Sequence, residues 1–235
     1  MKQAIKTGLA ALVLLLAISC KKENSTIQTS SIDINNSEQS RIPDTLYYAG
    51  KAIGIGTQVW MTKNLDVSHY RNGDPIPQVT DPIAWAALTT GAWCYYPAAG
   101  AIYGKLYNWY AVNDPRGLAP AGWHVPSDAE WTTLTTFLGG EAVAGGKMKE
   151  TGTTHWTSPN YGATNSSGFT GLPGGFCYID GTFNQLRYWG FWWSSTENYY
   201  INFADIRSLT SNYGNFPGGG YYNKHYGLSV RCVKN

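Results

Sequence analysis

The sequence predicts an α+β fold in which two helices pack on twisted antiparallel β-sheets that are connected by long loops. Both helical segments come before residue 140, and one of them has a clear start signal. After residue 140, short aromatic runs alternate with Gly, Asn, Ser and Pro, a pattern typical of short antiparallel strands joined by turns. The 10 Trp, 17 Tyr and 27 Gly of the chain suit such strands and turns. Helices followed by strands define the α+β class.

Residues 1–19 are expected to be a signal peptide. Two lysines precede an apolar run over residues 9–18, which is too short to span a membrane and typical of an export signal. The run ends in Ala17-Ile18-Ser19-Cys20, which resembles a bacterial lipobox, although Ala17 stands where Leu is usual. We therefore expect Cys20 to carry lipid and the protein to be an outer-membrane lipoprotein, periplasmic or surface-exposed. An ordinary cleaved signal peptide is the alternative.

Residues 20–45 are expected to form the lipidated end and a flexible tether. The segment is rich in Ser, Thr, Asn and Gln and has no sustained hydrophobic period, as in flexible linkers. Asp44-Thr45-Leu46 resembles an O-glycosylation sequon of some Gram-negative bacteria, which makes Thr45 a candidate acceptor, although such short patterns often arise by chance. The globular domain is then expected over residues 46–235.

The first elements of the domain are a hairpin and a helix. Residues 52–61 predict two strands around a Gly-containing turn. Residues 80–87 predict a short helix or loop, and residues 93–96 a short strand. In residues 103–112, apolar side chains at i, i+3 and i+4 predict a helix, which Asn113-Asp114-Pro115 would end.

The strongest helix signal begins at Ser127. Ser127 with Glu130 three residues later predicts a capping box, in which each residue bonds the other's backbone N–H. Trp131, Leu134 and Leu138 follow at i, i+3 and i+7. Two glycines at 139 and 140 then end the helix. The strand-like runs that follow are residues 168–172, 175–178, 188–193, 201–206 and 226–233.

Six blocks, in one order along the chain, resemble the Fibrobacter succinogenes major paralogous domain. The blocks are VWMTKNL (59–65), YGKLYNWYA (103–111), GWHVPSDAEW (122–131), GFTGLPGGF (168–176), WWSSTE (192–197) and YGLSVRCVK (226–234). This family is similar to proteins with a C-type-lectin-like fold, which implies that fold and a last strand paired with the first. The three cysteines that remain after Cys20 allow three single disulfides, of which the resemblance implies Cys94–Cys232, with Cys177 free and buried. It supplies no catalytic residue.

The resemblance to C-type lectins also suggests calcium as a candidate cofactor, and no other cofactor is expected. Lectins of that group hold Ca²⁺ with carboxylate and amide oxygens from loops before their last strands. The residues in a comparable place here are Glu197, Asn198, Asn202 and Asp205. The Glu-Pro-Asn and Trp-Asn-Asp motifs of lectins are absent, so a solvated loop is the alternative.

Aromatic residues in the late loops are candidate ligand-binding residues. Exposed Tyr among Gly and Asn can stack on sugar rings or form a protein interface. The alternative is that these rings fill the core of a domain poor in Leu and Ile. The candidates are Tyr199, Tyr200, Tyr213, Phe216, Tyr221 and Tyr222.

The sequence favours a binding function over catalysis. A net charge of +2 with only 14% charged residues argues against a nucleic-acid partner. The four His form no zinc-binding pattern, and no nucleophile motif is present. We expect a lipid-anchored module of the cell envelope that recognises a glycan or another surface protein through its late loops. The alternatives are a structural or accessory subunit of an outer-membrane complex, and an enzyme whose site the sequence does not disclose.

Overall fold

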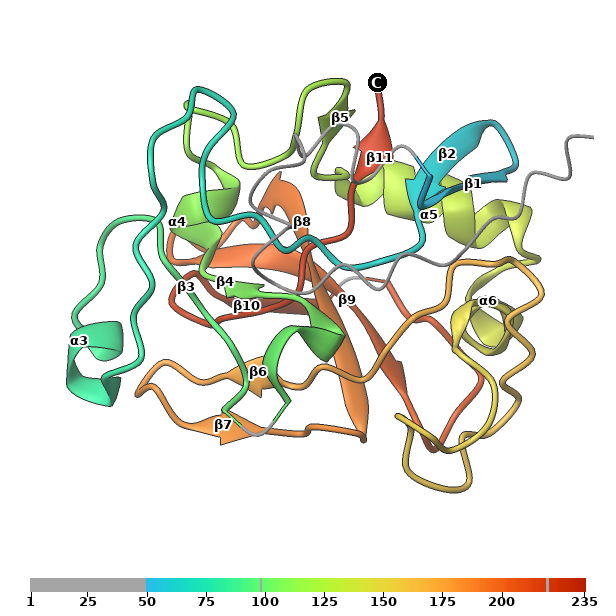
Figure 1. Cartoon of the computed structure of the whole chain (residues 1–235). Coiled ribbons are helices and arrows are strands. Elements are labelled where there is room, and N and C mark those ends of the chain that lie inside the picture. The colour runs from blue at the N-terminus through green and yellow to red at the C-terminus, as the bar shows by residue number, and fades with distance from the viewer. Residues whose placement is uncertain (1–49, 98, 219) are drawn as a thin grey trace, which may run out of the picture. The chain divides into compact units, whose positions relative to one another are not determined.

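The computed structural model describes residues 50–97, 99–218 and 220–235, all of which belong to one compact unit. The predicted signal peptide, Cys20, the tether and Thr45 lie outside these residues. The described part is an α+β structure with few helices and small antiparallel sheets (Figure 1). None of the helices in this part is both long enough and apolar enough to span a bilayer.

A four-stranded sheet joins the two ends of the domain. Strands β1 (Ala52–Ile55) and β2 (Gln58–Met61) form the predicted hairpin, turning at Gly56 with a φ of +63°. The sheet order is β1-β2-β11-β5, so β11 (Val233–Lys234) lies between β2 and β5 (Trp123–His124). The last strand therefore pairs with the first hairpin, through its second strand (Figure 1).

Helix α5 (Asp128–Phe137) begins with the predicted capping box. Ser127 Oγ accepts the Glu130 N–H at 3.3 Å, and Glu130 Oε2 accepts the Ser127 N–H at 2.8 Å. The helix buries Trp131 against Trp60 of β2, with ring centroids 4.6 Å apart. The cap thus sets where the helix starts, and an aromatic contact holds it on the terminal sheet.

A second long helix, α6 (Glu141–Met148), follows where the sequence predicted only strands. Gly145 and Gly146 lower the helix propensity of this segment. Both glycines are required by packing, because a Cβ would overlap the carbonyl oxygen of Asn215 at the first and of Gly162 at the second. A tertiary contact that the local sequence does not encode therefore explains the error.

The predicted helix over residues 103–112 is wrong for most of its length. The segment contains a 3-10 turn, η1 (Gly100–Tyr103), then β4 (Leu106–Tyr107), which pairs with β3 (Trp93–Cys94). Only the last turn is helical, α4 (Trp109–Val112). Asn108 breaks the segment, since its Oδ1 accepts the N–H groups of both Ala111 and Ala92 at 3.1 and 3.0 Å. The short helix α3 (Pro82–Ala86) agrees with the prediction for residues 80–87.

The late strands form a three-stranded sheet and a small hairpin. The sheet has the order β10-β9-β8, with β8 at Trp189–Glu197, β9 at Phe203–Thr210 and β10 at Gly220–Asn223. Strands β6 (Phe176–Cys177) and β7 (Phe183–Asn184) form the hairpin.

Two of the predicted late strands do not form ladders. In residues 168–172, positive φ angles at Gly168 (+70°) and Thr170 (+53°) interrupt the extended backbone. In residues 226–233, successive residues bridge Cys177, Tyr107 and Trp192, which belong to three different strands. This last segment therefore crosses between sheets and becomes a strand only at Val233.

Two buried cations, Arg231 and Lys149, organise the interior by donating hydrogen bonds to backbone carbonyls and, from Arg231, to an amide oxygen. Arg231 donates to Asn64 Oδ1 and to the carbonyls of Met61 and Phe169, at 2.7, 3.0 and 2.6 Å. Lys149 Nζ donates to the carbonyls of Tyr161, Thr210 and Tyr213 at 2.8, 2.9 and 2.8 Å. Burial lowers the pKa of Lys149 to about 8. These side chains supply hydrogen-bond donors to carbonyls in loops and at the ends of β2 and β9.

Candidate functional site

Four aromatic rings gather at the end of the late sheet, and we call them the tyrosine cluster. It consists of Tyr199, Tyr200, Phe203 and Tyr221. Tyr200 and Tyr221 lie 5.5 Å apart by ring centroids, and Phe203 and Tyr221 lie 5.6 Å apart. Tyr199 is 97% exposed, Tyr200 55% and Tyr221 43%. Large rings held this openly are available for contact with a ligand.

The turn between β8 and β9 positions this cluster. Asn198 Oδ1 accepts the Tyr200 N–H at 3.2 Å, and Asn198 Nδ2 donates to Asp205 Oδ1 at 2.6 Å. Tyr221 stands opposite Asp205 in the ladder between β9 and β10. The rings are therefore presented by a hydrogen-bonded turn and two paired strands.

A second group, the sheet cluster, lies on the opposite face of the same sheet. Tyr222 points away from Tyr221 because successive strand residues alternate between faces. Phe176 is the centre of the group and contacts Phe191 and Tyr226 at 5.5 Å each. The members are Phe176, Tyr178, Trp189, Phe191, Tyr222 and Tyr226.

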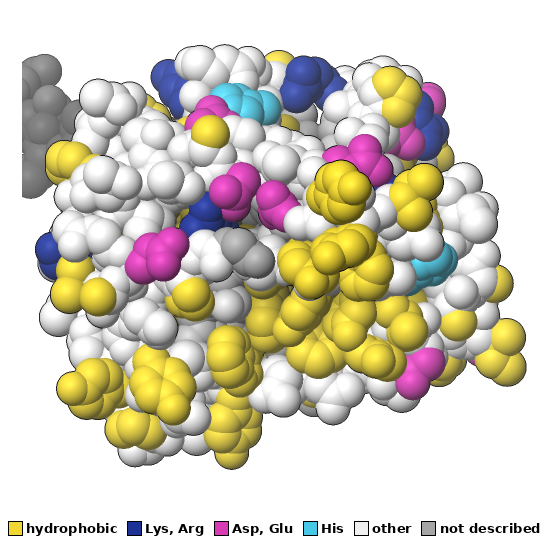
Figure 2. Space-filling view, turned by 180° about the vertical axis from the view of Figure 1, so that it is seen from behind, with side chains coloured by type: hydrophobic (Ala, Val, Ile, Leu, Met, Phe, Trp, Pro, Cys, Tyr) yellow, Lys and Arg dark blue, Asp and Glu magenta, His cyan; other side chains and the backbone are white. Residues whose placement is uncertain are grey.

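The sheet cluster is partly open to solvent. Figure 2 shows hydrophobic side chains gathered into a broad patch over the region where Figure 1 places β6 and β10. Burial raises the pKa of both Tyr222 and Tyr226 above the usual value, and a hydrogen bond with Tyr178 adds to the effect at Tyr226. These hydroxyls therefore stay protonated at neutral pH and can donate hydrogen bonds.

The structure separates the six predicted aromatic residues. Tyr199, Tyr200 and Tyr221 come together, whereas Tyr222 joins the sheet cluster. Tyr213 is 63% exposed, but no ring contact within the described part of the chain joins it to either cluster. Phe216 was wrongly predicted as a ligand-binding residue, since it is fully buried and its ring lies 5.8 Å from that of Trp131. The Phe216 ring fills the core beneath α5.

Of the four predicted calcium ligands, Glu197 and Asp205 already accept hydrogen bonds from protein donors. Lys224 Nζ donates hydrogen bonds to Glu197 Oε1 and to the Ile201 carbonyl, so a cation already lies at this turn. Asp205 accepts from Asn198, and the Asn202 carbonyl accepts the Lys224 N–H at 2.9 Å. Across the described ranges, no three His, Cys, Asp or Glu side chains are grouped to hold a metal. A calcium ion bound by Glu197 would have to displace the Lys224 ammonium from this carboxylate.

A cavity of about 440 Å³, lined by both polar and apolar side chains, lies near the β2–β4 side of the domain. Glu150 and His155 line it, with His155 Nδ1 and Glu150 Oε2 2.8 Å apart. The His155 ring also meets the edge of Tyr103 at 5.7 Å. A carboxylate at Nδ1 orients the imidazole and leaves Nε2 for a hydroxyl-bearing ligand. The other lining residues are Thr62, Lys63, Asn64, Asp66, Ala101, Ile102, Gly104, Thr170 and Leu172.

Neither this cavity nor the sheet cluster was predicted from the sequence. Glu150 and His155 are separated by five positions and match no motif. Phe176, Trp189 and Tyr226 meet only because β6, β8 and the segment after β10 come together. The one available signal was the density of aromatic residues after residue 175.

The predicted disulfide between Cys94 and Cys232 is not formed, and all three cysteines of the described part are free. Cys232 belongs to the main hydrophobic core, whereas Cys94 lies in a separate cluster that contains Cys177. A hydrogen bond with the Cys177 thiol, together with burial, raises the pKa of Cys94 well above its usual range. Cys177 is buried, as predicted. Different core locations therefore explain why the expected pair does not meet.

These observations define a class of small α+β domain whose surface carries clustered, exposed tyrosines. The Fibrobacter succinogenes major domain model matches residues 53–234, and the chain belongs to this family. No curated protein and no solved structure matches the chain.

Proposed function

We propose that the protein is a lipid-anchored, non-catalytic module of the cell envelope that recognises a glycan through the tyrosine cluster. The proposal includes lipid on Cys20, attachment to the outer membrane and a C-type-lectin-like fold. The terminal sheet, in which β11 pairs with the first hairpin, and the long connections around β8–β10 support that fold. The exposure of Tyr199, Tyr200 and Tyr221 on one site carries the proposal.

The chemistry of the cluster suits sugar rings. The face of a pyranose is apolar and stacks on an aromatic ring, while phenolic hydroxyls bond its hydroxyl groups. Tyr has few rotatable bonds, so ordering it on binding costs little entropy. The turn held by Asn198 reduces that cost further, because the rings are already positioned.

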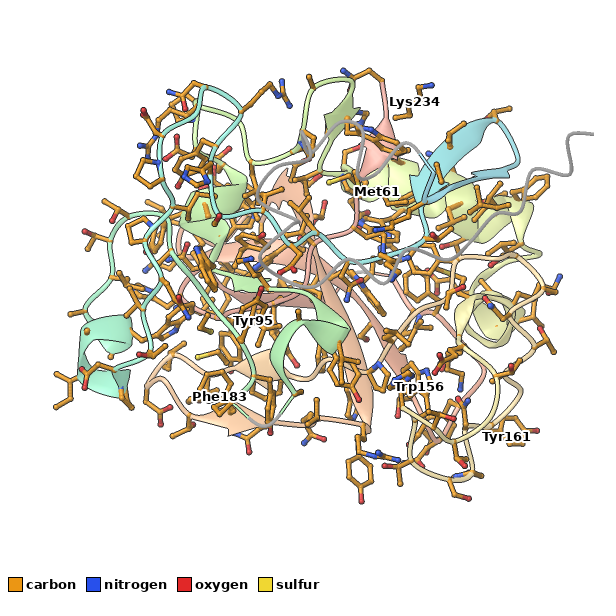
Figure 3. The ribbon with its side chains drawn as sticks, viewed as in Figure 1. Met61, Tyr95, Trp156, Tyr161, Phe183 and Lys234 are labelled. Carbon is orange, nitrogen blue, oxygen red and sulfur yellow. The ribbon has the colours of Figure 1, made fainter. Side chains whose placement is uncertain are left out.

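The test is binding of the lipid-free Cys20→Ser protein to an array of bacterial and host glycans. We expect binding that a calcium chelator leaves unchanged and that Tyr200→Ala with Tyr221→Ala weakens at least about tenfold, as for central aromatic contacts. Tyr161→Ala is the matched control, since Tyr161 is 63% exposed and points outward at the edge of the molecule (Figure 3).

Each other outcome of this experiment contradicts part of the proposal. Loss of binding in Tyr161→Ala as well would point to general damage and not to the cluster. A fourth variant, His155→Ala, alters the cavity. Loss of glycan binding in this variant alone would place the glycan in the cavity and not on the tyrosine cluster. Absence of binding to every glycan on the array would reject glycan recognition.

A second candidate function is docking to another envelope protein, which the sheet cluster favours. Broad exposed apolar patches are rare on monomeric proteins and often mark interfaces. Tyr178→Arg would introduce a charge at its rim, where Tyr178 is partly exposed. Under this reading, Tyr178→Arg abolishes copurification of a membrane protein after crosslinking and leaves glycan binding unchanged. Unaltered copurification would exclude the patch as the docking surface.

A further inference from the structure

Two short hairpins that are far apart in the sequence lie side by side. Cys94 ends β3, and Cys177 stands opposite Phe183 in the β6–β7 ladder. The ring of Phe183 meets that of Tyr96 with centroids 5.2 Å apart. Tyr95, which directly follows Cys94, and Phe183 lie in the same part of the molecule (Figure 3). The β3 end is therefore packed on the β6–β7 hairpin.

The two cysteines meet inside this contact. Cys94 is 0% exposed and Cys177 1%, and both belong to one small hydrophobic cluster with Trp85, Ala92 and Leu106. The neighbouring Cys177 thiol, together with burial, raises the pKa of the Cys94 thiol, in keeping with the shared place of the two thiols in this cluster. Cys232 lies in the main core beside β2, where its carbonyl accepts the Met61 N–H. Of the three thiols in the described part, only Cys94 and Cys177 are neighbours.

We propose that Cys94 and Cys177 form a disulfide when the chain folds in an oxidising compartment. The two thiols lose two protons and two electrons as the Sγ–Sγ bond forms, and the disulfide of a dithiol oxidase takes up both and becomes a dithiol. This disulfide depends on the proposed function in one respect, which is that the chain is exported. The bond would join the β3–β4 and β6–β7 hairpins covalently and close a long loop.

The surroundings of the pair determine when the bond forms. Trp85 covers the cluster and donates from Nε1 to the His225 carbonyl at 3.0 Å. Gly227 lies so close that a Cβ there would contact both Cys177 and the Trp85 ring. A protein oxidant cannot reach thiols enclosed in this way, and burial disfavours the reactive thiolate. The disulfide therefore forms before α3 and the segment around Gly227 close over it, and it resists reduction afterwards.

The experiment compares the Cys20→Ser chain made in the periplasm with the same chain refolded with oxidised and reduced glutathione. Each sample is unfolded in an alkylating reagent, and its intact mass and peptides are measured. We expect one alkylated residue, Cys232, and a peptide pair linked through Cys94 and Cys177. The oxidised protein should melt about 10 °C higher than the same protein refolded in reductant, as for a long closed loop.

Variants make the assignment specific. Cys232→Ser should keep the linked peptide pair, whereas Cys177→Ser should leave two alkylated thiols and no link. A linked pair of Cys94 and Cys232, or three alkylated thiols after refolding with oxidised glutathione, would overturn the proposal. A link that forms in glutathione but not in the periplasmic sample would support the pairing and contradict export, so the two failures are distinguishable.

Discussion

Replacing Lys149 with methionine tests how the buried ammonium contributes to stability. Three hydrogen bonds from a charged donor, each contributing about 1.5 kcal/mol, are lost in Lys149→Met. The same change removes the cost of burying the charge. The lowering of the Lys149 pKa from 10.5 to about 8 corresponds to about 3 kcal/mol. The lost hydrogen bonds outweigh the relieved burial cost, so we expect a net destabilisation of roughly 1 to 2 kcal/mol at pH 7.

The pH dependence separates the two contributions. Between pH 8 and 10.5 Lys149 is deprotonated in the folded state but protonated in the unfolded chain. The unfolded chain then binds more protons, so the free energy of unfolding rises with pH. For these two pKa values, the wild-type protein should gain about 2 kcal/mol between pH 7 and about pH 9.5 relative to Lys149→Met.

The assay is urea unfolding at both pH values, followed by tryptophan fluorescence. Lys147→Met is the matched control, because Lys147 Nζ donates to a single carbonyl, that of Leu138. The control should keep the pH dependence of the wild type. Identical pH dependence in the wild type and in Lys149→Met would refute the reasoning, since the ammonium would then be solvated in the folded state.

Three further predictions follow from the helices and the N-terminus. Ser127→Ala should lower the free energy of unfolding by about 1 kcal/mol through loss of the cap, and an unchanged melting temperature would contradict it. Gly145→Ala should destabilise by about 2 kcal/mol or more despite the better helix propensity of Ala, because the methyl group overlaps the Asn215 carbonyl; a stabilised variant would reject the close contact. Cys20→Ser should move the protein from the detergent phase to the aqueous phase in a Triton X-114 partition, and its retention in detergent would exclude lipid on Cys20.

Local signals in the sequence predicted the elements that depend on a few neighbouring residues. The capping box at Ser127 and the hairpin around Gly56 need only their own side chains and a permissive turn residue. Helix α6 was missed because its two glycines are required by close contacts with the carbonyls of residues 162 and 215, which lie far along the chain. Asn108 interrupts the predicted helix for the same reason, since one of its partners is Ala92.

The candidate site was predictable only in part. The composition of residues 197–224 indicated the tyrosines, but burial separates Phe216 from Tyr200 although both lie in this segment. The alternation of faces along β10 separates Tyr221 from Tyr222. Lys224 could not be recognised as the partner of Glu197 before the turn geometry was known. Tertiary contacts, which a single sequence does not encode locally, decide all three.

The order of the terminal sheet has a mechanical consequence for an anchored protein. Among the strands of the described part, β1 lies at the edge of this sheet and pairs with β2 alone, through four residue pairs. If the chain is anchored at Cys20, a pulling force reaches the described part of the chain first at this strand, while a ligand on the tyrosine cluster would apply the opposing force at β8–β10. The β1–β2 hairpin is thus the first element to bear the force. The hydrogen bonds between β1 and β2 can break while β11 still joins β2 to β5. Under tension, β1 would therefore separate from the sheet before the strands that carry the tyrosine cluster deform.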